Sequence, residues 1–194
     1  MSDEHDKRKR DFLVGVTAGM GTVATGAVLV PFVASWGPSE KAKAAGAPVE
    51  VDLGGEMQVY EWRGKPVWIL RRTKEMLATL DKLAASGRLV DPNSEMPQQP
   101  EYCKNKYRSQ KDEFLVVVGI CTHLGCSPTF RPDAHASDLG ADWPGGYFCP
   151  CHGSRFDFAG RVFKSMPAPK NLVIPPHKYL SDTTVLIGVD PEVA

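Results

Sequence analysis

The hydrophobic and polar positions of the chain divide it into a long apolar segment near the N-terminus and a longer mixed segment after it. Charged residues cluster before Phe12 and are then absent up to Ser39, a run of 28 residues. Residues 12–35 of this run number 24, and as a helix rising about 1.5 Å per residue they would extend roughly 36 Å. Because the hydrocarbon core of a bilayer is about 30 Å thick, the pattern predicts one transmembrane helix over 12–35.

The flanking residues indicate which way this helix crosses. The basic run at 7–10 lies directly before it and outweighs the neighbouring acids, so residues 1–11 are expected in the cytoplasm and the remaining chain across the membrane. A cleaved signal peptide is the alternative, because Ala42-Lys43-Ala44 offers a small-x-small cleavage pattern. The apolar run is longer than the roughly 7 to 15 residues of a signal's hydrophobic region, which favours a retained anchor.

A linker and a folded head follow the apolar segment. Residues 36–48 are rich in Ala, Gly and Pro with charges of both signs, a composition typical of a flexible hinge. Residues 49–194 combine β-branched and aromatic runs with turn residues, so they predict a head made mainly of strands. Strands are expected in 49–53, 57–64, 65–72, 114–122 and twice in 171–190, with a strand, a loop and a hairpin around Ala159-Gly160 in 145–164.

One helix is expected among the strands. Residues 73–86 open on Thr73, a candidate N-cap, and end before Gly87. Their large apolar residues share one face of the helix: Met76, Leu77, Leu80 and Leu83. With no internal repeat in the sequence, the head is expected to be mostly antiparallel β with this one helix.

The charge balance argues against one class of partner. The chain has 23 basic and 23 acidic residues, so its formal net charge is zero. No patch of basic and aromatic residues stands out, and the composition therefore gives no indication of nucleic-acid binding.

Two glycine-bearing loops concentrate the cysteines and histidines, "GICTHLGC" at 119–126 and "FCPCHGS" at 148–154. Each loop has a Cys and His pair plus a further Cys: Cys121, His123 and Cys126 in the first, and Cys149, His152 and Cys151 in the second. Two Cys and two His could hold a tetrahedral zinc ion. The short Cys-x-His step, the extra Cys in each loop and Ser154 after the second His count against zinc. From the residues alone, a zinc site and a different kind of metal centre both stay open.

The two motifs resemble the paired cluster-binding loops of the Rieske iron-sulfur proteins. With the anchor, the linker and the β-rich head, the whole chain resembles in organisation the Rieske subunits of quinol:cytochrome c oxidoreductases, the cytochrome bc complexes. The resemblance implies one [2Fe-2S] cluster per subunit. It assigns the ligands in pairs: Cys121 and Cys149 to one iron, and His123 and His152 to the other.

The same resemblance implies further parts of the site. Cys126 is expected to form a disulfide with Cys151, in a small cluster-binding subdomain at about 119–170 of an antiparallel β-sandwich head. Ser154 matches the family serine that donates to a sulfide, and Leu124 matches the leucine that shields the cluster at the quinol site. Residues 166–171, "MPAPKN", resemble the proline loop that covers the cluster, although Met166 stands near a position where the family often has glycine.

Mixed ligation has a direct electrochemical consequence. Replacing two thiolates by neutral imidazoles removes two negative charges, so the centre accepts an electron more easily. The reduction potential of such clusters lies at about −150 to +300 mV, against about −400 mV for clusters with four thiolates. Reduction in turn raises the proton affinity of the imidazoles of His123 and His152. Uptake of an electron with a proton suits the oxidation of a hydroquinone.

The remaining histidines and the fifth cysteine have no partner motif. His5, His135 and His177 are expected at the surface, and Cys103 is expected to be unpaired, either exposed or packed. The polar segment 127–147 between the two loops is expected to be a surface excursion.

As a member of this family the chain is expected to be the electron-transfer subunit of a respiratory ubiquinol-cytochrome c oxidoreductase, a translocase. It would take an electron and a proton from ubiquinol and pass the electron to a c-type cytochrome. The implied partners are cytochrome b, a c-type cytochrome subunit, ubiquinol and membrane lipid, within a dimeric complex. The alternatives are a Rieske carrier of another oxidoreductase, such as an arsenite oxidase or an oxygenase, and a zinc-stabilised anchored binding module.

The expected location is the bacterial inner membrane, with a single pass and the head in the periplasm. An iron-sulfur head would be loaded before export, which calls for a route that carries folded proteins. "KRDFL" at 9–13 resembles a twin-arginine signal, with Lys9 in place of the first arginine.

Overall fold

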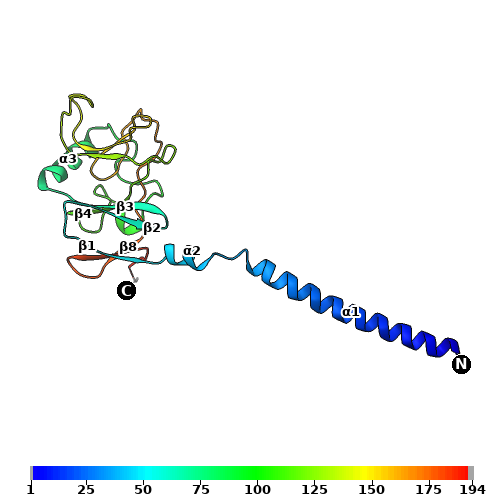
Figure 1. The fold of residues 1–194 in the computed structure, drawn as a ribbon. Helices are drawn as coiled ribbons and strands as arrows, with labels where there is room; N and C mark the ends of the chain where they lie inside the picture. The colour runs from blue at the N-terminus through cyan, green and yellow to red at the C-terminus, as the bar shows by residue number, and fades with distance from the viewer. Residues whose placement is uncertain (1, 192–194) are drawn as a thin grey trace. The chain divides into compact units, whose positions relative to one another are not determined.

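The computed structural model describes residues 2–191, which form two compact units, one up to Ala44 and one from Ala45 (Figure 1). Helix α1 (Ser2–Ala34) begins earlier than the predicted span, within the charged N-terminal segment. Good helix formers and an i,i+4 ion pair between Arg8 and Glu4 explain the extension. The part from Glu4 to Ala34 is long and apolar enough to cross a membrane.

The predicted hinge at 36–48 contains a short helix, α2 (Glu40–Ala45), with no buried residue. The Ser39 hydroxyl caps it by accepting a hydrogen bond from Ala42 N at 3.2 Å. A helix of six residues is too short to be stable on its own in water.

The head contains three antiparallel sheets of three strands each, in the orders β1-β9-β8, β2-β3-β4 and β5-β6-β7. The first comprises β1 (Val49–Asp52), β9 (Thr184–Ile187) and β8 (His177–Tyr179). The second comprises β2 (Met57–Trp62), β3 (Lys65–Arg71) and β4 (Phe114–Val118), and the third comprises β5 (Thr129–Arg131), β6 (Gly146–Phe148) and β7 (Arg155–Phe156). The prediction of a mainly β, antiparallel head is confirmed.

The sheet β2-β3-β4 is the middle layer of the head (Figure 1). Successive residues of its central strand, β3, point to opposite faces of the sheet. Four residues in a row are buried in β3, so both faces are covered. Val67 and Ile69 of β3 pack toward the β1-β9 side. Trp68 and Leu70 pack on the other side, in the cluster that contains Cys121 and Cys149. The two loops of interest therefore extend from a packed core.

The predicted helix is present as α3 (Lys74–Ala85), and Thr73 is its N-cap, with its side chain accepting from Met76 N at 3.3 Å. Met76, Leu80 and Leu83 are buried on one face, as the 3.6-residue period requires. A short 3₁₀ helix, η1 (Glu101–Cys103), ends on the buried Cys103, which is free.

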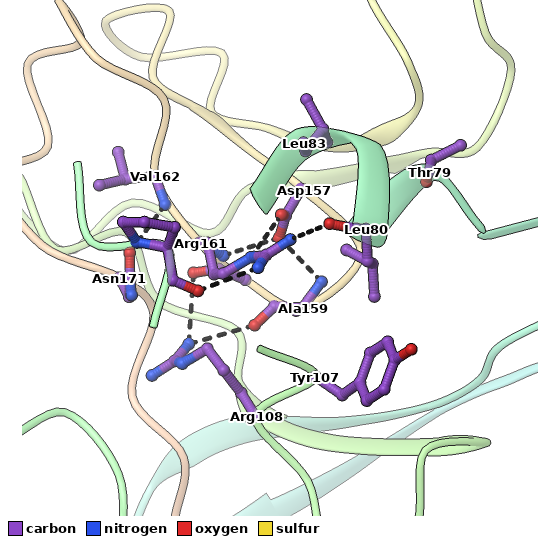
Figure 2. Close-up of polar contacts among 12 residues, drawn as sticks. Thr79, Leu80, Leu83, Tyr107, Arg108, Asp157, Ala159, Arg161, Val162 and Asn171 are labelled. Atoms are coloured by element: carbon purple, nitrogen blue, oxygen red, sulfur yellow. Dashed lines mark hydrogen bonds and ion pairs between the residues drawn. The ribbon is translucent and has the colours of Figure 1, made fainter. Parts of the chain in front are cut away.

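A buried polar network connects α3 to the segment that follows the second loop (Figure 2). Arg161 and Asp157 form an ion pair of 2.7 Å in which both side chains are fully buried. Arg161 also donates to Leu80 O at 3.0 Å, and Arg108 donates to Leu172 O at 2.7 Å. Both guanidinium groups thus donate to backbone carbonyls, which satisfies part of their buried N–H donors.

Two expectations about the surface are wrong. Segment 127–147 is not wholly a surface excursion, because it includes β5 and because Leu139 and Trp143 pack with Leu83 of α3. His177 is 1% exposed: its Nδ1 lies 2.9 Å from Pro175 O, and its Nε2 has no partner among the described residues. His135 is exposed, as expected.

The burial of His177 predicts a pH-dependent stability. Burial lowers the pKa of His177, while Pro175 and Asp190 oppose the shift. The unfolded chain therefore binds more protons than the folded chain below the ordinary histidine pKa of about 6.5, so stability falls as pH drops through that value. The stability advantage of the native chain over His177→Gln should shrink by up to about 1.4 kcal/mol per pH unit.

Urea unfolding of the full chain in detergent between about pH 7.5 and 5.5 measures this difference. His135→Gln, the same replacement at an exposed histidine, is the matched control. A His177→Gln curve parallel to the native curve over this range would contradict the prediction.

Candidate metal centre

The two loops close their backbones in the same way. Cys121 N donates to Cys126 O at 2.8 Å, and Gly125 N donates to Cys121 O at 3.0 Å. In the second loop Cys149 N donates to Ser154 O at 2.8 Å, and Gly153 N donates to Cys149 O at 2.9 Å. The glycine at each equivalent place has a positive φ, +88° in the first loop and +77° in the second. These turns require a residue that adopts left-handed backbone without strain.

The four predicted ligands lie on these two turns. Cys121 and Cys149 are free and buried. A side-chain hydrogen bond with Cys149 is among the causes that raise the pKa of the Cys121 thiol, so the two sulfur atoms are neighbours. The rings of His123 and His152 are 4.6 Å apart, centroid to centroid, and nearly perpendicular. The structure thus brings together one thiol pair and one imidazole pair.

The state of these donors fits a bound metal centre. His123 Nδ1 is buried and has no hydrogen-bond partner among residues 2–191, so it is available to a metal. Burial, more than any other cause, raises the pKa of the Cys121 thiol, and Cys149 raises it further, while hydrogen bonds with the His123 backbone and Ser154 lower it. Two buried thiols side by side are unfavourable as thiolates unless a cation neutralises them.

The disulfide between Cys126 and Cys151 is present, and it joins the two loops across 25 residues of sequence. The expected pairing is confirmed. The sulfurs of Cys126, Cys149 and Cys151 lie within 4.8 Å of one another. This trio is nevertheless not a metal site, because two of its sulfurs are bonded to each other and only Cys149 keeps a free thiol.

The proline loop is fixed to both turns by side-chain hydroxyls. Ser154 Oγ accepts from Ala168 N at 3.0 Å, which leaves its own proton free to be donated to a sulfur. Thr122 Oγ1 donates to Lys170 O at 2.6 Å. Thr122 was not among the predicted site residues, although its hydroxyl stands between two predicted ligands in "CTH". The two bonds hold residues 168–170 against the loops.

The outer face of the centre is open to solvent. His152 is exposed whereas His123 is half-buried. Leu124, next to His123, is 73% exposed. The arrangement presents one imidazole edge beside an apolar side chain.

Comparison with known proteins decides the family. Residues 96–177 match the model described as "Rieske [2Fe-2S] domain", and residues 1–39 match "Ubiquitinol-cytochrome C reductase Fe-S subunit TAT signal". The chain is 59% identical over 189 residues to the ubiquinol-cytochrome c reductase iron-sulfur subunit of Allochromatium vinosum, covering 95% of this chain and 90% of that protein. The chain belongs to this family of Rieske iron-sulfur subunits.

A second relative with the same name agrees with this assignment. The ubiquinol-cytochrome c reductase iron-sulfur subunit of Bradyrhizobium diazoefficiens is 40% identical over 192 residues, covering 96% of this chain and 97% of that protein. A solved chain of a hyperthermophilic respiratory complex III matches with a TM-score of 0.48 and 24% identity, and the match covers 88% of this chain and 97% of that chain.

Membership of the Rieske family means a [2Fe-2S] cofactor, so the zinc alternative is not supported. The twin-arginine resemblance at 9–13 lies inside the matched signal region.

One tuning donor of many family members is absent here. The resemblance to the Rieske proteins implies that many members have, at this position, a tyrosine whose hydroxyl reaches a ligand sulfur. This chain has Phe156 there, with a fully buried side chain. Tyr147 pairs with Phe156 across β6 and β7, but its hydroxyl donates to no loop residue. Its buried hydroxyl has no hydrogen-bond partner among the described residues, and burial raises its pKa.

Phe156→Tyr is therefore expected to raise the midpoint potential of the centre. A hydroxyl that donates to a ligand sulfur stabilises the more negative, reduced state. The extra oxygen in a filled core should also cost about 1–3 kcal/mol of stability. Redox titration followed by electron paramagnetic resonance measures the potential, and a potential that stays constant or falls would refute the role given to this position.

Proposed function

We propose that the protein is the electron-transfer subunit of a respiratory cytochrome bc complex, which takes an electron and a proton from ubiquinol and passes the electron to a c-type cytochrome. The observation that carries the proposal is the pairing of two free thiols with two facing imidazoles on disulfide-joined loops. Near-complete coverage of a relative named ubiquinol-cytochrome c reductase iron-sulfur subunit supports it.

We assign Cys121 and Cys149 as ligands of one iron and His123 and His152 as ligands of the other. The cluster, when bound, supplies a site for one electron at a potential that the neutral imidazoles raise. His152, the more exposed of the two histidines, presents a ring nitrogen that can accept a hydrogen bond from a quinol hydroxyl and then hold its proton. Leu124 beside it covers the quinol and excludes water.

The anchoring follows from the first unit of the chain. Helix α1 would cross the bacterial inner membrane once, with residues 1–11 in the cytoplasm because the basic run at 7–10 resists translocation. The head, residues 49–194, would then lie in the periplasm, where the disulfide is stable. Cytochrome b and a c-type cytochrome subunit are the partners in this assignment, within a dimeric complex.

Purification of the full chain from membranes tests the function. We expect it to copurify with haem-bearing subunits that oxidise ubiquinol and reduce a c-type cytochrome, in a reaction that quinol-site inhibitors block. Complex prepared without this chain should lose that reaction. Copurification with a non-haem oxidoreductase, such as an arsenite oxidase, would favour the alternative assignment.

The linker at 36–48 is proposed to let the head move between the quinol and the cytochrome. Its helix α2 has no buried residue and is too short to be stable on its own, so the linker can change conformation at a small cost in free energy.

Prolines placed at 41–44 should stiffen the linker and slow ubiquinol oxidation at least severalfold, with the spectrum of the reduced cluster unchanged. Steady-state turnover measures the effect, and Lys41→Ala, Lys43→Ala is the control, since positions 42 and 44 are already alanine. Normal turnover in the proline variant would contradict the tether.

A further inference from the structure

A small cleft lies beside the proline loop and outside the set of proposed ligands. Its volume is about 200 Å³, and it is lined by Arg88, Trp143, Arg155, Phe163, Lys164 and Met166. At roughly 30 Å³ per water molecule, this space equals about seven waters. It is smaller than the pockets of about 300–1,000 Å³ that hold drug-sized ligands, so a compact group fits it best.

The cleft gathers positive charge without compensation. Among residues 2–191, none of the cations Arg88, Arg155 and Lys164 forms an ion pair with a carboxylate. Arg88 is held in place, since its guanidinium carbon lies 5.3 Å from the centroid of the Phe163 ring and its Nη2 donates to Asp142 O at 3.1 Å. Three cations lining one small cavity, in a chain of zero net charge, favour an anion there.

One of the residues that line the cleft has a donor without an acceptor. Trp143 is 1% exposed, and its Nε1 has no hydrogen-bond partner among the described residues. An indole N–H can only donate, so its burial is unfavourable unless an acceptor arrives. The ring is fixed by Phe163, with centroids 6.3 Å apart. Neither residue belongs to the proposed cluster site or has a role in it.

We propose that this cleft binds a phosphate-class oxyanion. A phosphate group brings up to two negative charges and several acceptor oxygens in a volume that the cleft accommodates. Arg88 and Arg155 supply planar guanidinium donors that match phosphate oxygens, and Lys164 adds a point charge. The source is either inorganic phosphate or the headgroup of an anionic phospholipid, which share this chemistry.

Calorimetric titration of the full chain in detergent with inorganic phosphate, at constant ionic strength set by chloride, tests the first source. The second is tested by the tryptophan fluorescence of the chain reconstituted in vesicles of phosphatidylcholine, with and without phosphatidic acid. We expect saturable binding in the first arm or a fluorescence change specific to phosphatidic acid in the second. Of the four tryptophans in the chain, Trp143 is the one that lines the cleft. Trp143→Phe should therefore remove the fluorescence change that binding in the cleft produces.

The double variant Arg88→Gln, Lys164→Gln should weaken the interaction about tenfold or more, since two charged contacts are lost. Lys65→Gln, which removes an exposed charge at the β2–β3 turn, is the matched control and should bind as the native chain does. An unchanged signal of the reduced cluster in all variants shows that they are folded. The proposal is overturned if neither arm responds, or if acetate binds as tightly as phosphate.

Discussion

Cys149→Ser should leave the purified full-length protein without a cluster, and the dithionite-reduced variant should give no paramagnetic signal coupled to imidazole nitrogens. The four proposed donors are the free thiols of Cys121 and Cys149 and the imidazoles of His123 and His152, and the remaining loop sulfurs are consumed by the disulfide. A serine hydroxyl does not ionise readily enough to replace a thiolate on iron. No spare donor is available to complete the site.

Cys103→Ser is the matched control for this prediction. Cys103 is also free and fully buried, so both variants replace the same side chain in the interior. Burial raises the pKa of the Cys103 thiol to about 12, which keeps it protonated and inert. Cys103→Ser should retain the full signal. A normal signal in Cys149→Ser, or its loss in Cys103→Ser alone, would remove the proposed ligand set.

The parts of the fold that follow short-range patterns could be predicted from the sequence. The strand runs of β2 and β3, the α3 helix and its Thr73 cap each depend on residues a few positions apart. The site motifs are equally local, since Cys121 and His123 share one loop and Cys149 and His152 share the other. What the spacing alone did not provide was the joining of the two loops, which came from the family resemblance.

The parts that could not be predicted depend on contacts between distant residues. Thr122 donates to Lys170 O across 48 positions, and Arg108 donates to Leu172 O across 64. A histidine in a polar-looking context gives no indication of burial, yet His177 packs between the rings of Tyr102 and Tyr179. Charged residues were expected in solvent by default, so a fully buried pair could not be foreseen from composition.

The buried network supports the centre through the backbone. Asp157 Oδ1 accepts from Ala159 N and Arg161 N, both at 2.9 Å, and so fixes the hairpin that follows Ser154. Asn171 Oδ1 accepts from Val162 N at 2.9 Å and fixes the end of the proline loop to the same hairpin. The second cluster loop and the proline loop are therefore both connected to one hydrogen-bonded hairpin, whose contacts Figure 2 shows.

Asp157→Ala is accordingly expected to destabilise the head by about 3–5 kcal/mol, because it leaves the Arg161 guanidinium buried without its partner. This is a large part of the total stability of a domain, which is typically about 5–15 kcal/mol. Urea unfolding of the full chain in detergent measures the loss. The double variant Asp157→Ala, Arg161→Met should recover part of it, since the unpaired charge is then gone.

Asp138→Ala provides the matched comparison, since Asp138 forms an ion pair of the same length, 2.7 Å, with Arg131 at the surface. Solvent screens that pair, so its loss should change the unfolding curve little. Equal losses for Asp157→Ala and Asp138→Ala would show that burial of the charge is not the cause. A double variant less stable than Asp157→Ala would instead mean that the carbonyl contacts of Arg161, to Leu80 and Pro92, outweigh its unpaired charge.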